Sequence, residues 1–167
     1  MNTETYSKSQ ISWLMILRLF IGWHFMFEGI TKIINPSWTA LPYLLDSQGP
    51  FSSWFISMTQ NPGLMSFVDL ANQWGLLLIG LALTLGVFFR LASYGGILLL
   101  IMYTMSHPAL LSVNYMMAFE GTYLFIDKNV VEIAALGVLC VFPTSRVIGF
   151  DSLLARWCPA LVKYKLI

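Results

Sequence analysis

The sequence predicts an all-α fold, an integral membrane four-helix bundle, and three observations lead to that fold class. The 167 residues are 57% hydrophobic and only 10% charged, whereas soluble domains carry about 25% charged residues. Four apolar segments approach the roughly 20 residues that a helix needs to cross a bilayer. Lys and Arg residues occupy alternate connections between these segments, a pattern typical of multi-pass proteins. We therefore expect one membrane domain, residues 1–167, surrounded by a lipid bilayer.

The four predicted spans follow one another along the chain. The first, about residues 11–34, is too long for the apolar core of a signal peptide, and no small-residue cleavage site follows it, so we expect it to be retained. The second and third, about residues 64–89 and 91–106, are separated by Arg90 alone and should form a tight antiparallel hairpin. The fourth covers about residues 121–142.

The connection between the first two spans is rich in aromatic residues and proline. Residues 35–62 contain four Pro and two Trp residues. Trp and Tyr are enriched where a membrane meets water. We therefore expect short helices that lie in the interface and cap the helical bundle.

Basic residues indicate how the chain is oriented in the membrane. Those outside the spans lie before the first span, between the second and third, or after the fourth: Lys8, Arg90, Arg146, Arg156, Lys163 and Lys165. The other two connections contain no Lys or Arg. Cytoplasmic loops carry the excess of Lys and Arg, so we expect both termini in the cytoplasm of a bacterial cell, the protein in the inner (cytoplasmic) membrane, and the aromatic loop on the extracytoplasmic side.

The first span carries a stripe of ionisable residues within its apolar sequence. Arg18, His24, Glu28 and Lys32 share about a third of the helix circumference at 3.6 residues per turn. A charge at the centre of a bilayer costs about 2.5–3.5 kcal/mol on insertion scales, so such residues face the bundle interior and find partners. Glycines beside the stripe would let a second helix approach closely.

The outer ends of the other spans supply candidate partners for this stripe. Seven polar residues are expected at a similar depth: Asp69, Asn72, His107, Glu120, Asp127, Lys128 and Glu132. We therefore expect a polar pocket that opens toward the outer face, with Arg18 deeper as its floor.

Other interpretations of these residues remain open. The charged pairs could be structural, or Lys32, Asp127 and Lys128 could reach the lipid headgroups. His24 and His107 could be axial haem ligands, or His24 and Glu28 could bind a metal with Asp69 or His107, although we predict no metal site. Cys140 and Cys158 lack the spacing of a redox pair. The chain has no basic cluster for nucleic acid.

Four segments of the sequence resemble the DoxX/DoxD family of four-helix membrane proteins: LRLFIGWHFMFEGITKI, WGLLLIGLALTLGVFFRLAS, EGTYLFIDKNVVE and FPTSRVIGFDSLL. The resemblance covers residues 17–154 and depends on the order and spacing of Arg18, Gly22, Glu28, Gly29, Lys32, Gly75, Gly80, Gly86 and Arg90. Within the family, the chain is similar to the small subunit of thiosulfate:quinone oxidoreductase. The resemblance implies a four-helix bundle, a link to membrane quinones or sulfur redox chemistry, and a second subunit as partner.

The resemblance implies a quinone-dependent oxidoreductase, and in such an enzyme the pocket residues would have roles in quinone reduction. His24 would donate a hydrogen bond to a quinone carbonyl and relay protons. Lys32 or Arg18 would stabilise negative charge on the oxygen, and Glu28, Asp69 and Glu132 would carry protons outward. No flavin, haem or iron–sulfur motif is visible, so electrons would come from a small donor or a partner redox subunit.

A second hypothesis assigns the chain no catalysis. The same mixed charges would suit a lipid headgroup or a small anion, and the aromatic loop would suit docking of a partner protein or of another copy of the chain in a homo-oligomer.

Overall fold

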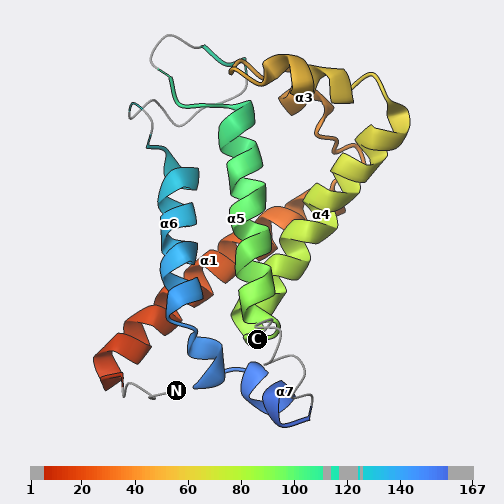
Figure 1. Cartoon of the computed structure of the whole chain (residues 1–167). Helices are drawn as coiled ribbons and strands as arrows, with labels where there is room; N and C mark the ends of the chain where they lie inside the picture. Colours follow the sequence, from red (N-terminus) through yellow and green to blue (C-terminus); the bar gives the residue numbers. More distant parts are fainter. Residues whose placement is uncertain (1–5, 111–113, 117–123, 125, 158–167) are drawn as a thin grey trace.

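The computed structural model describes residues 6–110, 114–116, 124 and 126–157. Every regular element in this part of the chain is helical (Figure 1). The elements, in order, are α1 (Lys8–Ile34), α2 (Leu41–Leu45), α3 (Ser52–Met58), α4 (Pro62–Leu85), α5 (Phe89–Ser106), α6 (Lys128–Val141), the 3-10 turn η1 (Thr144–Arg146) and α7 (Asp151–Trp157). The all-α prediction is therefore confirmed for the described residues.

Three of these helices, α1, α4 and α5, are long and apolar enough to cross a membrane. α6 differs from the predicted fourth span because its described helix has 14 residues, about 21 Å at 1.5 Å per residue, against a hydrocarbon core of about 30 Å. It begins at Lys128 because the side chain of Asp127 caps it, with Oδ1 accepting from the backbone N of Val130 at 2.9 Å. Residues 121–123 and 125 of the predicted span lie outside the described residues.

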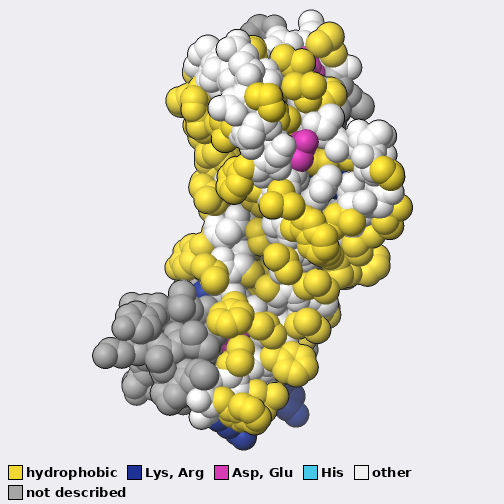
Figure 2. Space-filling view, turned by 90° about the vertical axis from the view of Figure 1, so that its right-hand side faces the viewer, with side chains coloured by type: hydrophobic (Ala, Val, Ile, Leu, Met, Phe, Trp, Pro, Cys, Tyr) yellow, Lys and Arg dark blue, Asp and Glu magenta, His cyan; other side chains and the backbone are white. Residues whose placement is uncertain are grey.

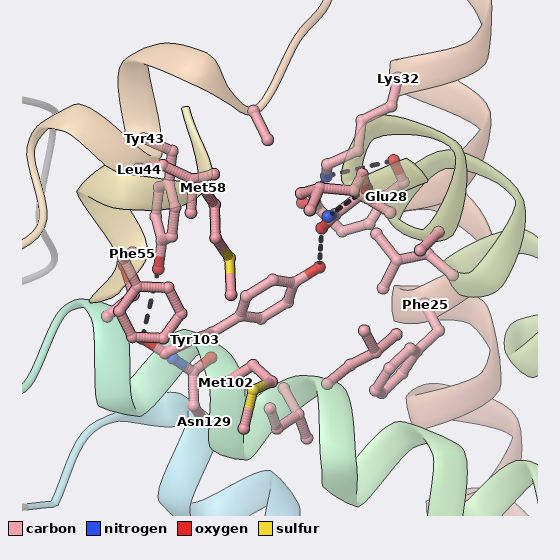
Figure 3. A pocket seen from close by; sticks show the side chains of 18 of the residues that line it. Phe25, Glu28, Lys32, Tyr43, Leu44, Phe55, Met58, Met102, Tyr103 and Asn129 are labelled. Atoms are coloured by element: carbon pink, nitrogen blue, oxygen red, sulfur yellow. Dashed lines mark hydrogen bonds and ion pairs between the residues drawn. The ribbon is translucent and has the colours of Figure 1, made fainter. Parts of the chain in front are cut away.

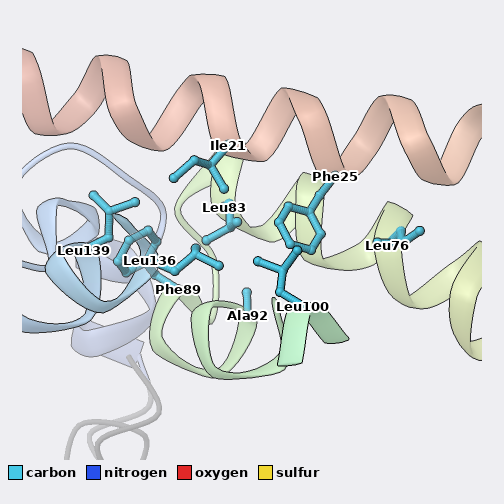
Figure 4. Packing of buried hydrophobic residues seen from close by; sticks show 9 residues of the cluster. All are labelled: Ile21, Phe25, Leu76, Leu83, Phe89, Ala92, Leu100, Leu136 and Leu139. Carbon is cyan, nitrogen blue, oxygen red and sulfur yellow. The ribbon is translucent and has the colours of Figure 1, made fainter. Parts of the chain in front are cut away.

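α1 packs along α4, and glycine makes that contact close. Gly22 and Gly29 of α1 and Gly80 of α4 are buried where the two backbones meet. α5 packs between α4 and α6. The four helices contribute to one apolar core, which Figure 4 shows: Ile21, Phe25, Leu76, Leu83, Phe89, Ala92, Leu100, Leu136 and Leu139.

The predicted hairpin between the second and third spans turns earlier than the sequence indicated, at residues 86–88, so Arg90 lies inside α5 and not in the turn. α4 ends at Leu85 because Gly86 adopts φ 67°, a left-handed conformation suited to glycine. The carboxylate of Asp151, far along the chain, then accepts from the backbone N of Phe88 at 2.8 Å and of Phe89 at 3.1 Å. A distant side chain thus caps the start of α5.

The predicted short helices in the first long connection are confirmed as α2 and α3. We call residues 35–61, which include both, the cap. Leu44 of α2 and Phe55 of α3 are buried with Ala40 and Met65 in a second apolar cluster. In Figure 1 the cap lies at the opposite end of the molecule from α7. It therefore covers one end of the helices.

The surface between these two ends is largely apolar. Figure 2 shows hydrophobic side chains over much of the visible face, while Lys and Arg side chains gather at the end that holds α7. Large side chains on α1, α4 and α5 are exposed there, including Phe20, Trp23, Leu78 and Leu98. A lipid environment accommodates such a surface without the cost that water would impose.

Candidate functional site

A cavity of about 530 Å³ lies between the helices and the cap. α1, α4, α5 and α6 form its walls, and α2 and α3 cover one side. Most of the lining is aromatic or aliphatic, with Trp38, Tyr43, Leu44, Trp54, Phe55, Met58, Phe67 and Met102 among its members. Figure 3 shows Glu28 and Lys32 on one side, Leu44, Phe55 and Met58 on the other, and the ring of Tyr103 extending between them.

His24 and Glu132 form the first polar pair in this lining. Nδ1 of His24 lies 3.0 Å from Oε1 and 3.1 Å from Oε2 of Glu132. The contact joins α1 to α6, which are separated by about a hundred residues in sequence but held together by the shared core. The carboxylate fixes the imidazole orientation and leaves the other ring nitrogen, Nε2, available for a proton or a ligand.

Glu28 and Lys32 form the second polar pair, one helical turn apart on α1. Their carboxylate and ammonium form an ion pair, and the Lys32 ammonium also donates to the Glu28 carbonyl oxygen at 3.3 Å. The ammonium lies 5.6 Å from the ring centre of Trp38, in cation–π range. The cap thus contributes to holding Lys32 at the cavity.

Tyr103 and Asn72 form the third polar pair, which sequence reasoning found only in part. The hydroxyl of Tyr103 on α5 donates to Oδ1 of Asn72 on α4 at 2.5 Å, and Nδ2 of Asn72 donates to the Val68 carbonyl at 2.8 Å. Asn72 was predicted at the site, but Tyr103 was not. The available signal was the placement of Tyr103 and Ser106 three residues apart, on one face of α5.

The structure brings together six of the residues predicted from sequence. The cavity lining includes His24, Glu28, Lys32, Asn72, Lys128 and Glu132. It also includes Asn129 and Ser106, which the sequence did not single out. Three residues of the stripe on α1 therefore line the same cavity as polar residues of α4, α5 and α6.

Two predicted site residues near the cavity do not line it and have structural roles. Asp69 accepts from the Thr39 hydroxyl at 2.9 Å and from the Ala40 backbone N at 2.8 Å, so it fastens the cap to α4. Asp127 caps α6, as described above, and accepts from the side chain of Asn129 at 3.2 Å. Glu120 lies outside the described residues.

His107 lies behind the cavity wall, in a buried cluster beneath the cap. Its ring stacks on Tyr43 at 3.9 Å between centres and lies 4.5 Å from the ring of Tyr115. Nδ1 lies 3.1 Å from the Ser106 hydroxyl, and Nε2 lies 3.8 Å from the Asp46 carboxylate. Burial lowers the pKa of His107 below its ordinary value, and the nearby Asp46 opposes that shift.

Arg18 lies away from the cavity, next to the α4–α5 turn. Its Nη1 donates to the Thr144 hydroxyl at 3.2 Å and to the Ile148 carbonyl at 2.8 Å, and the guanidinium lies 5.9 Å from the ring centre of Phe89. The side chain is buried. Arg18 therefore fastens the segment after α6 to α1, whereas the apolar core residues Phe25, Leu76 and Leu100 line the cavity.

The site has the shape and chemistry for a small organic ring more than for a metal ion. Among the described residues, no group of three His, Cys, Asp or Glu side chains could hold a metal. The two imidazoles have separate partners, Glu132 for His24 and Ser106 for His107. The cavity volume falls within the roughly 300–1,000 Å³ of small-molecule sites, which combine an apolar lining with a few convergent polar groups.

In a comparison with protein families, the model of the family described as DoxX matches residues 13–109. This range runs from within α1 to the end of α5 and leaves out α6, which carries Glu132. No match was found among curated proteins or among solved structures.

Proposed function

The chain belongs to the DoxX family, and from this premise we propose that it is a membrane subunit of a quinone-linked redox system whose cavity binds a quinone headgroup. The observation that carries the proposal is the convergence of three polar pairs, His24–Glu132, Glu28–Lys32 and Tyr103–Asn72, in a cavity lined mainly by aromatic and aliphatic side chains. A flat ring with two carbonyl oxygens needs this combination of apolar walls and few, directed polar groups.

The residues present fit such a headgroup. Aromatic side chains from the cap and from α4 and α5 provide flat surfaces, with Trp38, Tyr43 and Phe55 among them. His24 and Lys32 provide donors on α1, one helical turn either side of Glu28. A bound quinone supplies the chemistry of accepting two electrons and two protons.

The chain's own residues would then move protons and balance charge. His24 would pass a proton from Nε2 to a ligand oxygen, and Glu132 would hold the ring and stabilise its charged form. The Lys32 ammonium would stabilise negative charge that develops on the oxygen. Glu28 keeps that ammonium in place, and its carboxylate balances the positive charge when the cavity is empty. Electrons would come from a small donor or a partner subunit.

The arrangement in the membrane follows from the same proposal. We infer that α1, α4 and α5 cross the inner membrane of a bacterium and that α6, with residues before it, provides a fourth crossing. The end that holds α7 would face the cytoplasm, which is supported by the Lys and Arg side chains gathered there (Figure 2) and by the positive-inside rule. The cap and the cavity would lie at the extracytoplasmic end.

Titration with decylubiquinone tests the proposed site. Trp38 and Trp54 line the cavity, so binding should quench tryptophan fluorescence of the protein in mild detergent. Tyr103→Phe should weaken binding about 3- to 10-fold, since one hydrogen bond contributes about 0.5–1.5 kcal/mol. Tyr94→Phe is the matched control, because Tyr94 is on the same helix but 59% exposed, and it should bind as the wild type does. Equal affinities in all three proteins would refute this placement of the headgroup.

Mass spectrometry of molecules that co-purify in mild detergent separates this function from the non-catalytic alternative. The balanced charges of Glu28, Lys32 and their neighbours also suit a zwitterionic lipid headgroup. Quinone in the wild type and its loss in the double variant His24→Ala/Glu28→Gln would support the redox subunit. A phospholipid in the wild type that the double variant loses would instead support lipid binding.

A further inference from the structure

The chain has two histidines, and each lies beside a carboxylate next to the same cavity. His24 pairs with Glu132 in the lining itself. His107 lies one layer behind it, with Asp46 on its far side. Reduction of a quinone consumes two protons, so two separate imidazole–carboxylate pairs match the number of protons that the reaction needs. The first pair belongs to the site described above, and the second has no role there.

Ser106 connects His107 to the cavity. It is part of the lining, and its hydroxyl lies 3.1 Å from Nδ1 of His107. Ser106 and Tyr103 lie three residues apart on α5, and both line the cavity. A hydroxyl can accept a proton from an imidazole as it donates its own.

The other side of His107 faces Asp46 in a buried environment. His107 is 5% exposed and Asp46 3%. Nε2 of His107 is buried and makes no hydrogen bond within the described part of the chain, and it lies 3.8 Å from Oδ2 of Asp46. A closing movement of about 1 Å would bring these atoms within hydrogen-bond distance. Tyr43 and Tyr115 are the other titratable groups against the ring, and their stacking fixes its plane.

Asp46 in turn bonds to an exposed residue. Its Oδ1 accepts from the backbone N of Met116 at 3.1 Å, and Met116 is 86% exposed. The row Ser106, His107 and Asp46 thus runs from the cavity to Met116, an exposed residue.

We propose that Ser106, His107 and Asp46 form a second proton pathway that joins the cavity to the surface at the cap. This proposal rests on the proposed function. For each proton delivered, the Ser106 hydroxyl gives its proton to a ligand oxygen and takes one from Nδ1 of His107. Nε2 of the ring takes a proton that arrives through Asp46, so one proton enters at the surface and one leaves into the cavity. Oxidation of a quinol would drive the same path in reverse.

Nitrogen NMR of the two histidines tests the pathway. If the role of His107 were purely structural, its signals would not respond to reduction of the bound quinone. The protein labelled with 15N-histidine has signals from only two imidazoles, and His107→Gln assigns them. Reduction of bound decylubiquinone by dithionite should shift the His107 signals in the wild type. Ser106→Ala should abolish that shift, and Ser106→Thr, which keeps the hydroxyl, should restore it.

Stopped-flow reduction of bound decylubiquinone by dithionite supplies the second readout. His107→Gln and Asp46→Asn keep hydrogen-bonding side chains of similar size, so we expect quinone affinity within about twofold of the wild type and at least about tenfold slower reduction. Unchanged reduction in either variant that binds normally, or His107 signals that do not respond in the wild type, would overturn the pathway. A wild type that binds no decylubiquinone would overturn the proposed function itself, and the pathway with it.

Discussion

Substitution of Gly80 by alanine tests the close packing of α1 on α4. A Cβ at this position would lie 2.3 Å from the backbone N of Met26, 2.6 Å from its Cα and 2.7 Å from the carbonyl oxygen of Gly22. All three neighbours are backbone atoms, so no side chain can rotate away. Restoring an ordinary contact of about 3.4 Å requires the helices to separate by about 1 Å at this point.

The expected loss follows from the cost of overpacking. Inserting a methyl group into a tightly packed interior costs about 1–3 kcal/mol and occasionally more, and Gly80 is at the severe end because both helices must move. A loss of about 3 kcal/mol corresponds to a decrease in Tm of about 6–12 °C for a chain of this size. The separation would also widen the cavity between α1 and α4 and weaken ligand binding.

Gly137→Ala is the matched control for this prediction. Gly137 also lies inside a helix, α6, but a Cβ there would meet nothing within 4 Å. Alanine is favoured over glycine in a helix interior by roughly 0.5–1 kcal/mol, so this variant should be slightly more stable than the wild type. Thermal unfolding in mild detergent, followed by circular dichroism, measures both. A Gly80→Ala protein as stable as Gly137→Ala would refute the close helix contact.

Three further predictions concern the ends of the bundle. Asp151→Asn should lower the free energy of unfolding by about 1–3 kcal/mol, because the charged cap of α5 is lost, and denaturant unfolding measures the change. Asp69→Ala should speed proteolysis within residues 35–61, since the contacts to Thr39 and Ala40 disappear; equal cleavage rates would contradict the fastening role. Burial lowers the pKa of folded His107, so the unfolded chain binds that proton more readily. The free energy of unfolding should therefore be highest above about pH 6.5 and fall as the pH drops toward the pKa of His107 in the folded protein. His107→Gln should flatten this dependence in a series of Tm measurements, and an unchanged slope would contradict it.

The sequence by itself determined the fold class and the first wall of the site. Low charge and long apolar runs leave few alternatives to membrane helices, and the 3.6-residue period places His24, Glu28 and Lys32 on one side of α1 without reference to any other element. The aromatic composition of the first long connection also predicted its short helices. These features are local, so the order of residues is sufficient to find them.

Only the tertiary structure decided which residues complete the site. Tyr103 and Ser106 became part of the cavity because α5 packs between α4 and α6, a contact that no local pattern encodes. Arg18 shares the stripe with His24, yet it lies at the α4–α5 turn because about two helical turns separate them along the axis and the segment after α6 supplies its partners. Asp151 caps a helix that begins more than sixty residues earlier. Such pairings depend on which helix faces meet, and the packing of the whole chain sets those faces.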